Sequence, residues 1–463
     1  MTTKKFKSYP KYKDSGIQWV GMLPENWNIK KIKHNTYVKG RIGWQGLKSD
    51  EFIDVGPYLV TGTDFAGKGI NWNACYHISE DRYKEDPYIQ LMENDLLITK
   101  DGTIGKTAIV EGLIGKASLN SGVFVTRPKK DYITAYLFWV LNSMIFIEFI
   151  NYMKSGTTIS HLYQNVFVDF SFPVPTVNEQ YLIASFLDRK TAHIDSLIDK
   201  KERQIELLQE MRAALISHAV TKGLDPTVPM KDSGVEWLGE IPKNWTLTSL
   251  RRCISFLTDF EANGSFQTIK DNVQIVDDDT KYAWYVRATD LENNRNHKSI
   301  ESHFINIKTY YFLSKTKLFG NELLVVKRGE IGKVYLMPEI QFPASLAPNL
   351  YLIQLNTKLT STYAFHWFRS TIGKRFLSNA NKSTTIGALY KDDVKNCEIL
   401  LPSLPEQLEI MDYLDIETAS IDSLISKIQL SIDKLREYRT ALISAAVTGK
   451  IDVRDDRDGE EAA

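Results

Sequence analysis

Two long stretches of the chain, one in the middle and one at the C-terminus, alternate apolar and polar residues with a helical period. From Pro173 the first reads PVPTVNEQYLIASFLDRKTAHIDSLIDKKERQIELLQEMRAALISHAVTKG, and from Leu401 the second reads LPSLPEQLEIMDYLDIETASIDSLISKIQLSIDKLREYRTALISAAVTGK. Apolar residues recur every three or four positions, which predicts helices that each carry one apolar stripe. These residues are Ile194, Ile198, Ile205, Leu208 and Leu215 in the first stretch and Ile421, Ile425, Ile428, Ile432, Leu435 and Leu442 in the second.

Both stretches begin with the signature of a helix start. A proline precedes a capping box, which Thr176 forms with Glu179 in the first stretch and Ser403 with Glu406 in the second. In a capping box the two side chains satisfy N–H groups that the first helical turn leaves without partners. Each stretch is therefore predicted to open a long helix directly after its proline.

The two predicted helices, residues 176–222 and 403–450, are expected to pair with each other. Roughly thirty striped residues at about 1.5 Å each form a rod of about 45 Å, which can bury its stripe only against another helix. We therefore predict an antiparallel coiled coil. Arg212 and Arg439 interrupt the stripe at equivalent positions, so they can fix the register or the orientation of the pair.

The chain is a tandem duplication. The segment KDSGIQWVGMLPENW, residues 13–27, returns as KDSGVEWLGEIPKNW, residues 231–245, with nine of fifteen positions identical. We call these two segments the lead-ins. The turn DLLITKDGTIGK, a loop of the form T-T-I-x-x-L-Y and the long helix recur 227 residues later, whereas the lead-in recurs 218 residues later. A length change therefore lies between the lead-in and the central strands of the two halves.

The fold predicted from these patterns is α+β. Short runs of β-branched and aromatic residues, broken by Gly, Asn and Asp, predict the strands of a mixed sheet in each half. Two similar domains, residues 1–175 and 223–402, are then separated by the two long helices in a pseudo-twofold arrangement. The charged residues 451–463 have nothing to bury and are predicted to form a disordered tail.

The composition bears on how the chain can bind nucleic acid and on its cellular location. The 463 residues include 57 basic and 57 acidic side chains, so nucleic-acid binding has to be local or shared with partner proteins. Cys75, Cys253 and Cys397 are far apart and form neither a disulfide framework nor a zinc motif, which favours a cytoplasmic location. The N-terminus lacks the apolar core of a signal peptide.

One apolar segment, residues 133–153, has about the length of a transmembrane helix. Its counterpart in the second half, residues 361–376, is amphipathic and carries Arg369, Lys374 and Arg375. The comparison favours a buried helix of a soluble domain over a membrane span.

Motifs that carry catalysis are absent from the sequence. We find no metal-ligand spacing, no G-x-S-x-G, no Asn-Pro-Pro-Tyr of an amino-methyltransferase and no Gly-rich cofactor turn. The turn DGTIGKT resembles the end of a phosphate-binding loop, but Lys100 stands where that loop needs Gly, and the second copy has Val334 where it needs Ser or Thr. A β-turn with an exposed lysine is the favoured interpretation.

Loops with groups suited to DNA phosphates and base edges occur at matched places in both halves. Two such domains on paired helices would meet a duplex at two places about one helical turn apart, roughly 34 Å, and read two half-sites with an unread spacer between them. The candidate residues are Lys100, Thr103, Lys106, Ser118, Asn120, Lys154, Thr157 and Thr158 in the first half and Lys327, Arg328, Lys333, Asn349, Lys382, Thr384 and Thr385 in the second.

Over nearly its whole length the chain resembles the specificity subunits of type I restriction-modification enzymes. The resemblance rests on the W-x-G-x-x-P-x-x-W lead-ins, the I-G-K turns, the T-T-I-x-x-L-Y loops and the P-x-x-x-E-Q helix starts at Pro175 and Pro402. It implies a non-catalytic subunit whose two target-recognition domains each read one half of a bipartite site in double-stranded DNA. The helices are then expected to set the spacer and to dock two methyltransferase subunits, which motor-nuclease restriction subunits join.

The resemblance implies that the cofactors bind to other subunits of the enzyme. S-adenosylmethionine, ATP and Mg are expected in the partner subunits, and none is expected in this chain. We also expect Gln180 and Gln407, near the two helix starts, to contribute to methyltransferase binding. Two alternatives stay open: a coiled-coil scaffold that joins proteins without reading DNA, and a nucleotide-dependent enzyme built on the GKT turn.

Overall fold

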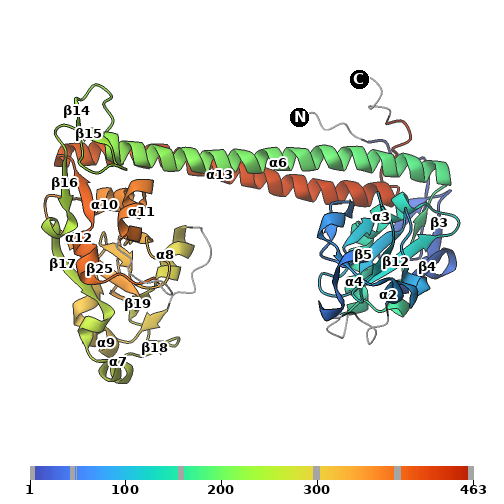
Figure 1. Cartoon of the computed structure of the whole chain (residues 1–463), viewed down its shortest axis with the longest axis horizontal. Helices are drawn as coiled ribbons and strands as arrows, with labels where there is room; N and C mark the ends of the chain where they lie inside the picture. The colour runs from blue at the N-terminus through green and yellow to red at the C-terminus, as the bar shows by residue number, and fades with distance from the viewer. Residues whose placement is uncertain are drawn as a thin grey trace. The chain divides into compact units, whose positions relative to one another are not determined.

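The chain folds as two compact units, and each contains one globular domain and part of both long helices (Figure 1). Unit 1 comprises Met1–Glu202 with Gln429–Ala463, and unit 2 comprises Arg203–Ile428. The structure is a computed structural model that describes residues 6–41, 47, 49–154, 161–295, 303–379 and 387–456.

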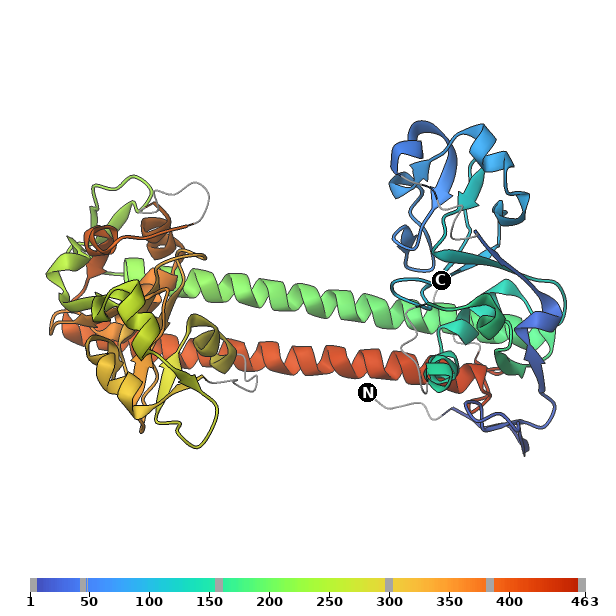
Figure 2. The same cartoon turned by 90° about the horizontal axis from the view of Figure 1, so that it is seen from below.

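The two long helices are α6, Val177–Lys222, and α13, Leu404–Val447. Their predicted pairing is confirmed: the α6 and α13 segments of each unit lie side by side (Figures 1 and 2). Thr176 caps α6 as predicted, because its Oγ1 accepts a hydrogen bond from the Glu179 N–H at 3.4 Å. The backbone leaves α6 at Gly223 with a φ of +78°, a left-handed conformation that favours glycine.

None of the residues in the apolar stripe predicted for the two helices is exposed. Each of its members is buried or half-buried, while neighbours such as Leu207 and Leu430 are about half exposed. The buried members are Ile194, Ile198, Ile421, Ile432 and Leu442, and the half-buried ones are Ile205, Leu208, Leu215, Ile425, Ile428 and Leu435.

The domain of unit 1 is built on a four-stranded antiparallel sheet in the order β10-β9-β12-β4. A second sheet, β11-β5-β8, pairs β11 with β5 in parallel, and apolar residues such as Leu97, Val125 and Leu119 form a core cluster across the two sheets. The strands are β4 Thr36–Gly40, β5 Ile53–Val60, β8 Tyr76–His77, β9 Leu96–Thr99, β10 Thr107–Ile109, β11 Ala117–Leu119 and β12 Val123–Pro128.

Smaller elements complete unit 1. The lead-in forms the hairpin β1-β2, and β3 pairs with β13 directly before the long helix. Their bounds are β1 Tyr12–Asp14, β2 Met22–Pro24, β3 Asn28–Lys31, β6 Phe65–Ala66, β7 Gly69–Ile70, β13 Ser171–Val174, α1 Ile32–Asn35, α2 Glu80–Lys84, α3 Thr134–Leu141, α4 Met144–Lys154 and α5 Gln164–Phe167.

Unit 2 repeats this plan, with a four-stranded antiparallel sheet in the order β17-β25-β22-β23. A five-stranded sheet, β18-β20-β19-β24-β21, contains the parallel pair β19 with β24. The strands are β17 Ile254–Asp259, β18 Ile275–Val276, β19 Ala283–Val286, β20 Phe304–Ile305, β21 Lys317–Leu318, β22 Leu323–Val326, β23 Val334–Leu336, β24 Ala344–Leu346 and β25 Leu350–Leu355.

The predicted length change falls between β17 and β19, where unit 2 carries the helix α7, Phe266–Asn272. The β4–β5 connection of unit 1 is shorter. The other elements of unit 2 are β14 Met230–Asp232, β15 Glu240–Pro242, β16 Thr246–Ser249, β26 Glu398–Leu401, α8 Ala288–Arg295, α9 Ile307–Phe312, α10 Ser361–Arg369, α11 Thr371–Asn379 and α12 Lys391–Asn396.

The apolar segment of the first half forms two helices instead of one. Helices α3 and α4 meet at a bend of 58°, and residues 136–141 are all buried. In the parts of the chain that the structure describes, no single helix is long and apolar enough to cross a membrane, although this bent pair has the necessary length and composition.

Residues 451–456, assigned from the sequence to a disordered tail, are instead packed on unit 1. The Asp452 N–H donates to the Lys7 carbonyl oxygen at 2.7 Å, and Val453 is buried. The sequence did not indicate this contact, because Lys7 lies at the other end of the chain. The remaining residues of the predicted tail, 457–463, lie outside the described residues.

Candidate nucleic-acid interface

The β9–β10 turn presents Thr103 and Lys106 to solvent. The Thr99 hydroxyl accepts a hydrogen bond from the Lys106 N–H at 3.0 Å and closes the turn, while Gly102 and Gly105 have φ values of +65° and +88°. The turn leads into an antiparallel strand, whereas a phosphate-binding loop leads into a helix whose N-terminus holds the phosphate. The interpretation as a β-turn is therefore confirmed.

The equivalent β22–β23 turn of unit 2 carries Arg328 and Lys333. Arg328 is exposed, but the Lys333 Nζ lies 2.6 Å from the Glu292 carboxylate and also contacts Glu330. Hydrogen bonds to Glu292 and then to Glu330 hold the pKa of Lys333 above its usual value. Two carboxylates therefore neutralise Lys333, while its counterpart Lys106 has no ion pair among the residues that the structure describes.

Three sequence-predicted candidates are buried. The Lys100 Nζ lies 3.0 Å from Asp101 and 5.8 Å from the centre of the Phe124 ring. Ser118 is completely buried and accepts a hydrogen bond from Arg41 at 3.3 Å. These side chains support the domain, so we do not propose them as ligand contacts.

The third buried candidate, Lys327, is the counterpart of Lys100 in unit 2. Its Nζ lies 2.8 Å from Asp259 and 2.5 Å from Glu261, and Lys391 approaches Asp259 at 2.8 Å from another element. Burial acts to raise the pKa of Asp259, but the hydrogen bonds from Lys327 and Lys391 outweigh it and lower the pKa. Lys327 therefore also belongs to the support of its domain.

The loops singled out in the sequence come together in unit 1, and we call this region the loop edge of unit 1. The Lys100 N–H donates to the Gly122 carbonyl at 2.9 Å, and the Leu162 N–H donates to the Lys100 carbonyl at 2.8 Å. Asp101 forms a β-bridge and a side-chain contact with His161. The turn, the loop after β11 and the segment at residues 161–162 are therefore adjacent.

The loop edge of unit 2 repeats these contacts. The Lys327 N–H donates to the Asn349 carbonyl at 2.8 Å, and the Leu389 N–H donates to the Lys327 carbonyl at 3.0 Å. Arg328 forms the bridge with Ala388 that Asp101 forms with His161 in unit 1. Asn349 is exposed with a φ of +71°, so it stands out from the loop beside Arg328.

The remaining candidates differ in what the structure shows of them. Asn120 is half-buried, and its Oδ1 accepts a hydrogen bond from the Ser121 N–H at 2.7 Å. Lys154 is the last residue of α4, and its side chain is not described. The other candidates, Thr157, Thr158, Lys382, Thr384 and Thr385, lie outside the described residues.

His161 is not among the residues that the sequence singled out, although the comparison of the two halves points to it. It occupies a variable position of the T-T-I-x-x-L-Y loop, where the second copy has Ala388. Positions that differ between otherwise equivalent loops are where two copies can contact different ligands.

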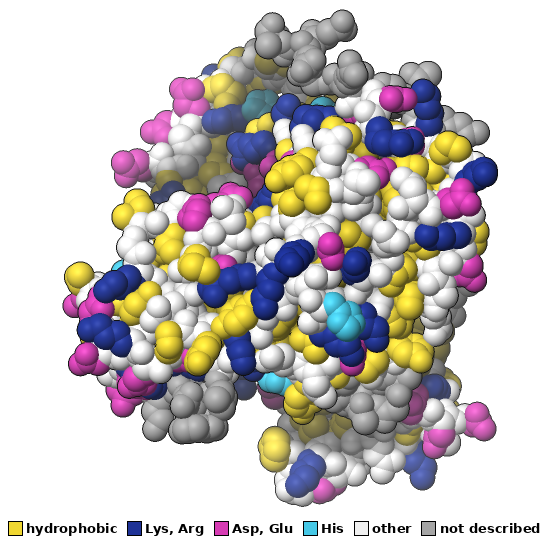
Figure 3. Space-filling view, turned by 90° about the vertical axis from the view of Figure 1, so that its right-hand side faces the viewer, with side chains coloured by type: hydrophobic (Ala, Val, Ile, Leu, Met, Phe, Trp, Pro, Cys, Tyr) yellow, Lys and Arg dark blue, Asp and Glu magenta, His cyan; other side chains and the backbone are white. Residues whose placement is uncertain are grey.

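Figure 3 shows the surface of unit 1, where Lys and Arg side chains are interspersed with acidic and hydrophobic ones.

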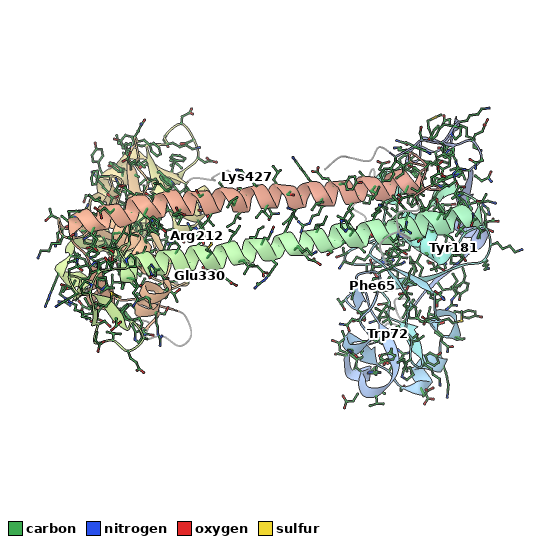
Figure 4. All side chains as sticks on the ribbon, turned by 90° about the horizontal axis from the view of Figure 1, so that it is seen from above. Phe65, Trp72, Tyr181, Arg212, Glu330 and Lys427 are labelled. Atoms are coloured by element: carbon green, nitrogen blue, oxygen red, sulfur yellow. The ribbon has the colours of Figure 1, made fainter. Side chains whose placement is uncertain are left out.

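The arginines that interrupt the helix stripe form equivalent ion pairs. In unit 1, the Arg439 Nε lies 2.8 Å from the Asp195 carboxylate. In unit 2, the Arg212 Nε lies 3.0 Å from Asp422, and Figure 4 shows Arg212 on α6. Each pair joins α6 to α13. In both pairs the arginine lies in the C-terminal half of its helix and the aspartate in the N-terminal half of the other, as expected for antiparallel helices.

The expectation that Gln180 and Gln407 contact a partner protein is wrong. Both side chains are completely buried and bind backbone groups of their own unit. A polar residue near a helix start is usually exposed, but here the domain covers both glutamines.

In the described part of the chain, no three His, Cys, Asp or Glu side chains are grouped to hold a metal ion.

Comparison with known proteins identifies relatives along nearly the whole chain. The family model of the type I restriction modification DNA specificity domain matches residues 24–207 and 260–434. The MjaVIII type I restriction enzyme specificity subunit of Methanocaldococcus jannaschii is 24% identical over 445 residues, which cover 94% of this chain and 95% of the relative. The EcoBI specificity subunit of Escherichia coli is 24% identical over 369 residues, with coverage of 77% and 73%.

Solved structures share the fold. A chain from a study of complex assembly and conformational transition of the type I R-M system matches with a TM-score of 0.70 and 12% identity, over 93% of this chain and 99% of the other. The HsdS subunit from Thermoanaerobacter tengcongensis matches with a TM-score of 0.52 and 13% identity, over 93% and 98%. At such identities the likeness concerns the fold alone.

Proposed function

The chain belongs to the family of type I restriction-modification DNA specificity proteins, and from this premise we propose that each unit reads one part of a bipartite site in double-stranded DNA. The observation that carries the proposal is the loop edge, which recurs in both units with the same backbone contacts. Exposed polar and basic groups stand on it: Thr103 and Lys106 in unit 1, Arg328 and Asn349 in unit 2.

The two loop edges carry different chemistry at matched positions. Unit 1 has Asp101 with His161, whereas unit 2 has Arg328 with Ala388. A carboxylate accepts hydrogen bonds from cytosine, and an arginine donates two to guanine, so the two positions favour different bases. We propose that this difference makes the two half-sites unequal and the whole site asymmetric.

We further propose that the paired helices dock two methyltransferase subunits, and that motor-nuclease restriction subunits join the assembly in the cytoplasm. The exposed faces of the helices hold apolar side chains suited to such docking; these are Leu207 and Met211 on α6 and Ile416, Leu424 and Leu430 on α13. On this proposal the chain is not catalytic. S-adenosylmethionine, ATP and Mg would be bound by the partner subunits.

Sequencing of methylated adenines in host DNA tests the proposal. The host genome is compared with and without this gene, in the presence of its candidate methyltransferase. A gapped two-part motif that disappears with the gene is the expected result. An unchanged pattern of methylation, with the methyltransferase expressed, would instead favour the coiled-coil scaffold.

Replacing Lys106 by Ala is expected to weaken binding to all DNA sequences by a similar factor. The slope of log K against log salt concentration should fall in magnitude by about one, because one phosphate contact is lost. Lys333→Ala should change the slope less, since Glu292 and Glu330 already neutralise that lysine. Binding titrations at several salt concentrations measure both slopes.

The variant Asn349→Ala should instead alter the preferred sequence in one half-site, because a base contact discriminates and a phosphate contact does not. Indistinguishable effects of the Lys106, Lys333 and Asn349 variants on every duplex would contradict these assignments.

A further inference from the structure

One buried glutamine ties the domain of unit 1 to the start of α6. The Gln180 Oε1 accepts a hydrogen bond from the Ile133 N–H at 2.9 Å. Its Nε2 donates to the carbonyl oxygens of Asp131 at 2.7 Å and Pro175 at 2.9 Å. Both amide hydrogens and the amide oxygen are therefore used, and they join the loop before α3 to the turn before α6.

Gln407 makes the same three bonds in unit 2. Its Oε1 accepts from the Thr360 N–H at 3.0 Å, and its Nε2 donates to the carbonyl oxygens of Lys358 at 2.9 Å and Pro402 at 3.1 Å. Each partner lies 227 residues after its counterpart in unit 1. The arrangement is thus a property of the repeated fold and does not depend on the loops that differ between the copies.

The glutamate that precedes each glutamine holds the lead-in. The Trp27 indole N–H donates to Glu179 at 3.2 Å, and the Trp245 indole N–H donates to Glu406 at 2.8 Å. Both tryptophans are completely buried. The predicted capping glutamates therefore bind the lead-in instead of the helix N-terminus.

Each domain also grips the end of the other long helix. In unit 1 the Tyr136 hydroxyl donates to the Val447 carbonyl oxygen at 3.2 Å, and in unit 2 the Tyr363 hydroxyl donates to that of Val220 at 3.2 Å. These two tyrosines are also completely buried. Buried hydrogen bonds therefore join the domain of unit 1 to the start of α6 and the end of α13. They join the domain of unit 2 to the start of α13 and the end of α6.

We propose that Gln180 and Gln407 are positioning residues that fix the orientation of each recognition domain on its helices, and thereby the spacer length that the protein accepts. This inference rests on the proposed function. A change of one base pair moves a half-site by about 3.4 Å and rotates it by about 35°. A rigidly held domain cannot follow that change, whereas a loosened one can.

The test measures binding of duplexes that keep both half-sites and have spacers one base pair shorter, equal or one base pair longer than the native spacer. The protein is the full chain in complex with its methyltransferase. Gln180→Met keeps the length of the side chain without burying a charge, but it leaves three backbone groups unpaired. Gln204→Met, at an exposed position of α6, is the matched control.

Gln180→Met should reduce the preference for the native spacer by about tenfold, which corresponds to 1.4 kcal/mol. The penalty for a changed base within a half-site should stay as in the wild type, and Gln204→Met should change neither quantity. Glu179→Gln, which keeps an oxygen for the Trp27 indole, serves as a milder second variant and should give a smaller reduction of the same preference.

An unchanged spacer preference in both Gln180→Met and Glu179→Gln would overturn the inference, as would an equal loss of affinity for all duplexes. If Gln180→Met does not fold, the milder variant and Gln407→Met decide the question. A wild-type complex without preference for two half-sites would instead refute the proposed function, so the two failures are distinguishable.

Discussion

Replacing Ile432 by Asp is expected to lower the free energy of unfolding of unit 1 by about 4 kcal/mol or more. Ile432 lies on the stripe of α13 and is 1% exposed. The variant loses the apolar contacts of the isoleucine and places a carboxylate where water does not reach it. Because the helices separate more readily, co-purification with the methyltransferase should also fail.

Leu430→Asp is the matched control for the unfolding measurement alone, since Leu430 is 55% exposed on the same helix. Its effect should be within about 0.5 kcal/mol of zero. Urea unfolding followed by circular dichroism measures both variants. Equal destabilisation by the two would show that Ile432 is not held in a helix pair.

The variants Trp27→Ala and Trp245→Ala are each expected to destabilise their own unit by about 3–5 kcal/mol. Each indole is completely buried at the junction of a lead-in with a long helix, and the Trp27 ring also packs edge-on against Tyr9. Trp→Phe at either position keeps most of the packing. It should cost about 1.5–3 kcal/mol, because the hydrogen bond to a carboxylate is lost.

Hydrogen exchange resolved along the sequence distinguishes the two units. Trp27→Ala should accelerate exchange mainly in residues 6–202 and 429–456, and Trp245→Ala mainly in residues 203–428. Acceleration of the same peptides by both variants would contradict a separate stabilising role of each tryptophan.

Several candidate contacts could not be judged from the sequence. Lys100 and Lys327 follow strands directly, as an exposed turn lysine does, but both side chains turn inward. The Lys327 ammonium meets Asp259, which lies 68 residues earlier on β17. No local pattern reports a partner at that separation, because burial depends on how the strands pair.

The duplication, the two long helices, their pairing and the class of the fold follow from the sequence alone. Each of these can be recognised from the local periodicity of apolar residues or from the comparison of one half with the other. The sequence could not show that the segments at Lys100, Gly122 and Leu162 meet at one edge, that Lys333 is neutralised, or that Gln180 and Gln407 face inward. Those properties depend on contacts between segments far apart in the chain, where the burial of a polar group and its hydrogen-bond partner are set together.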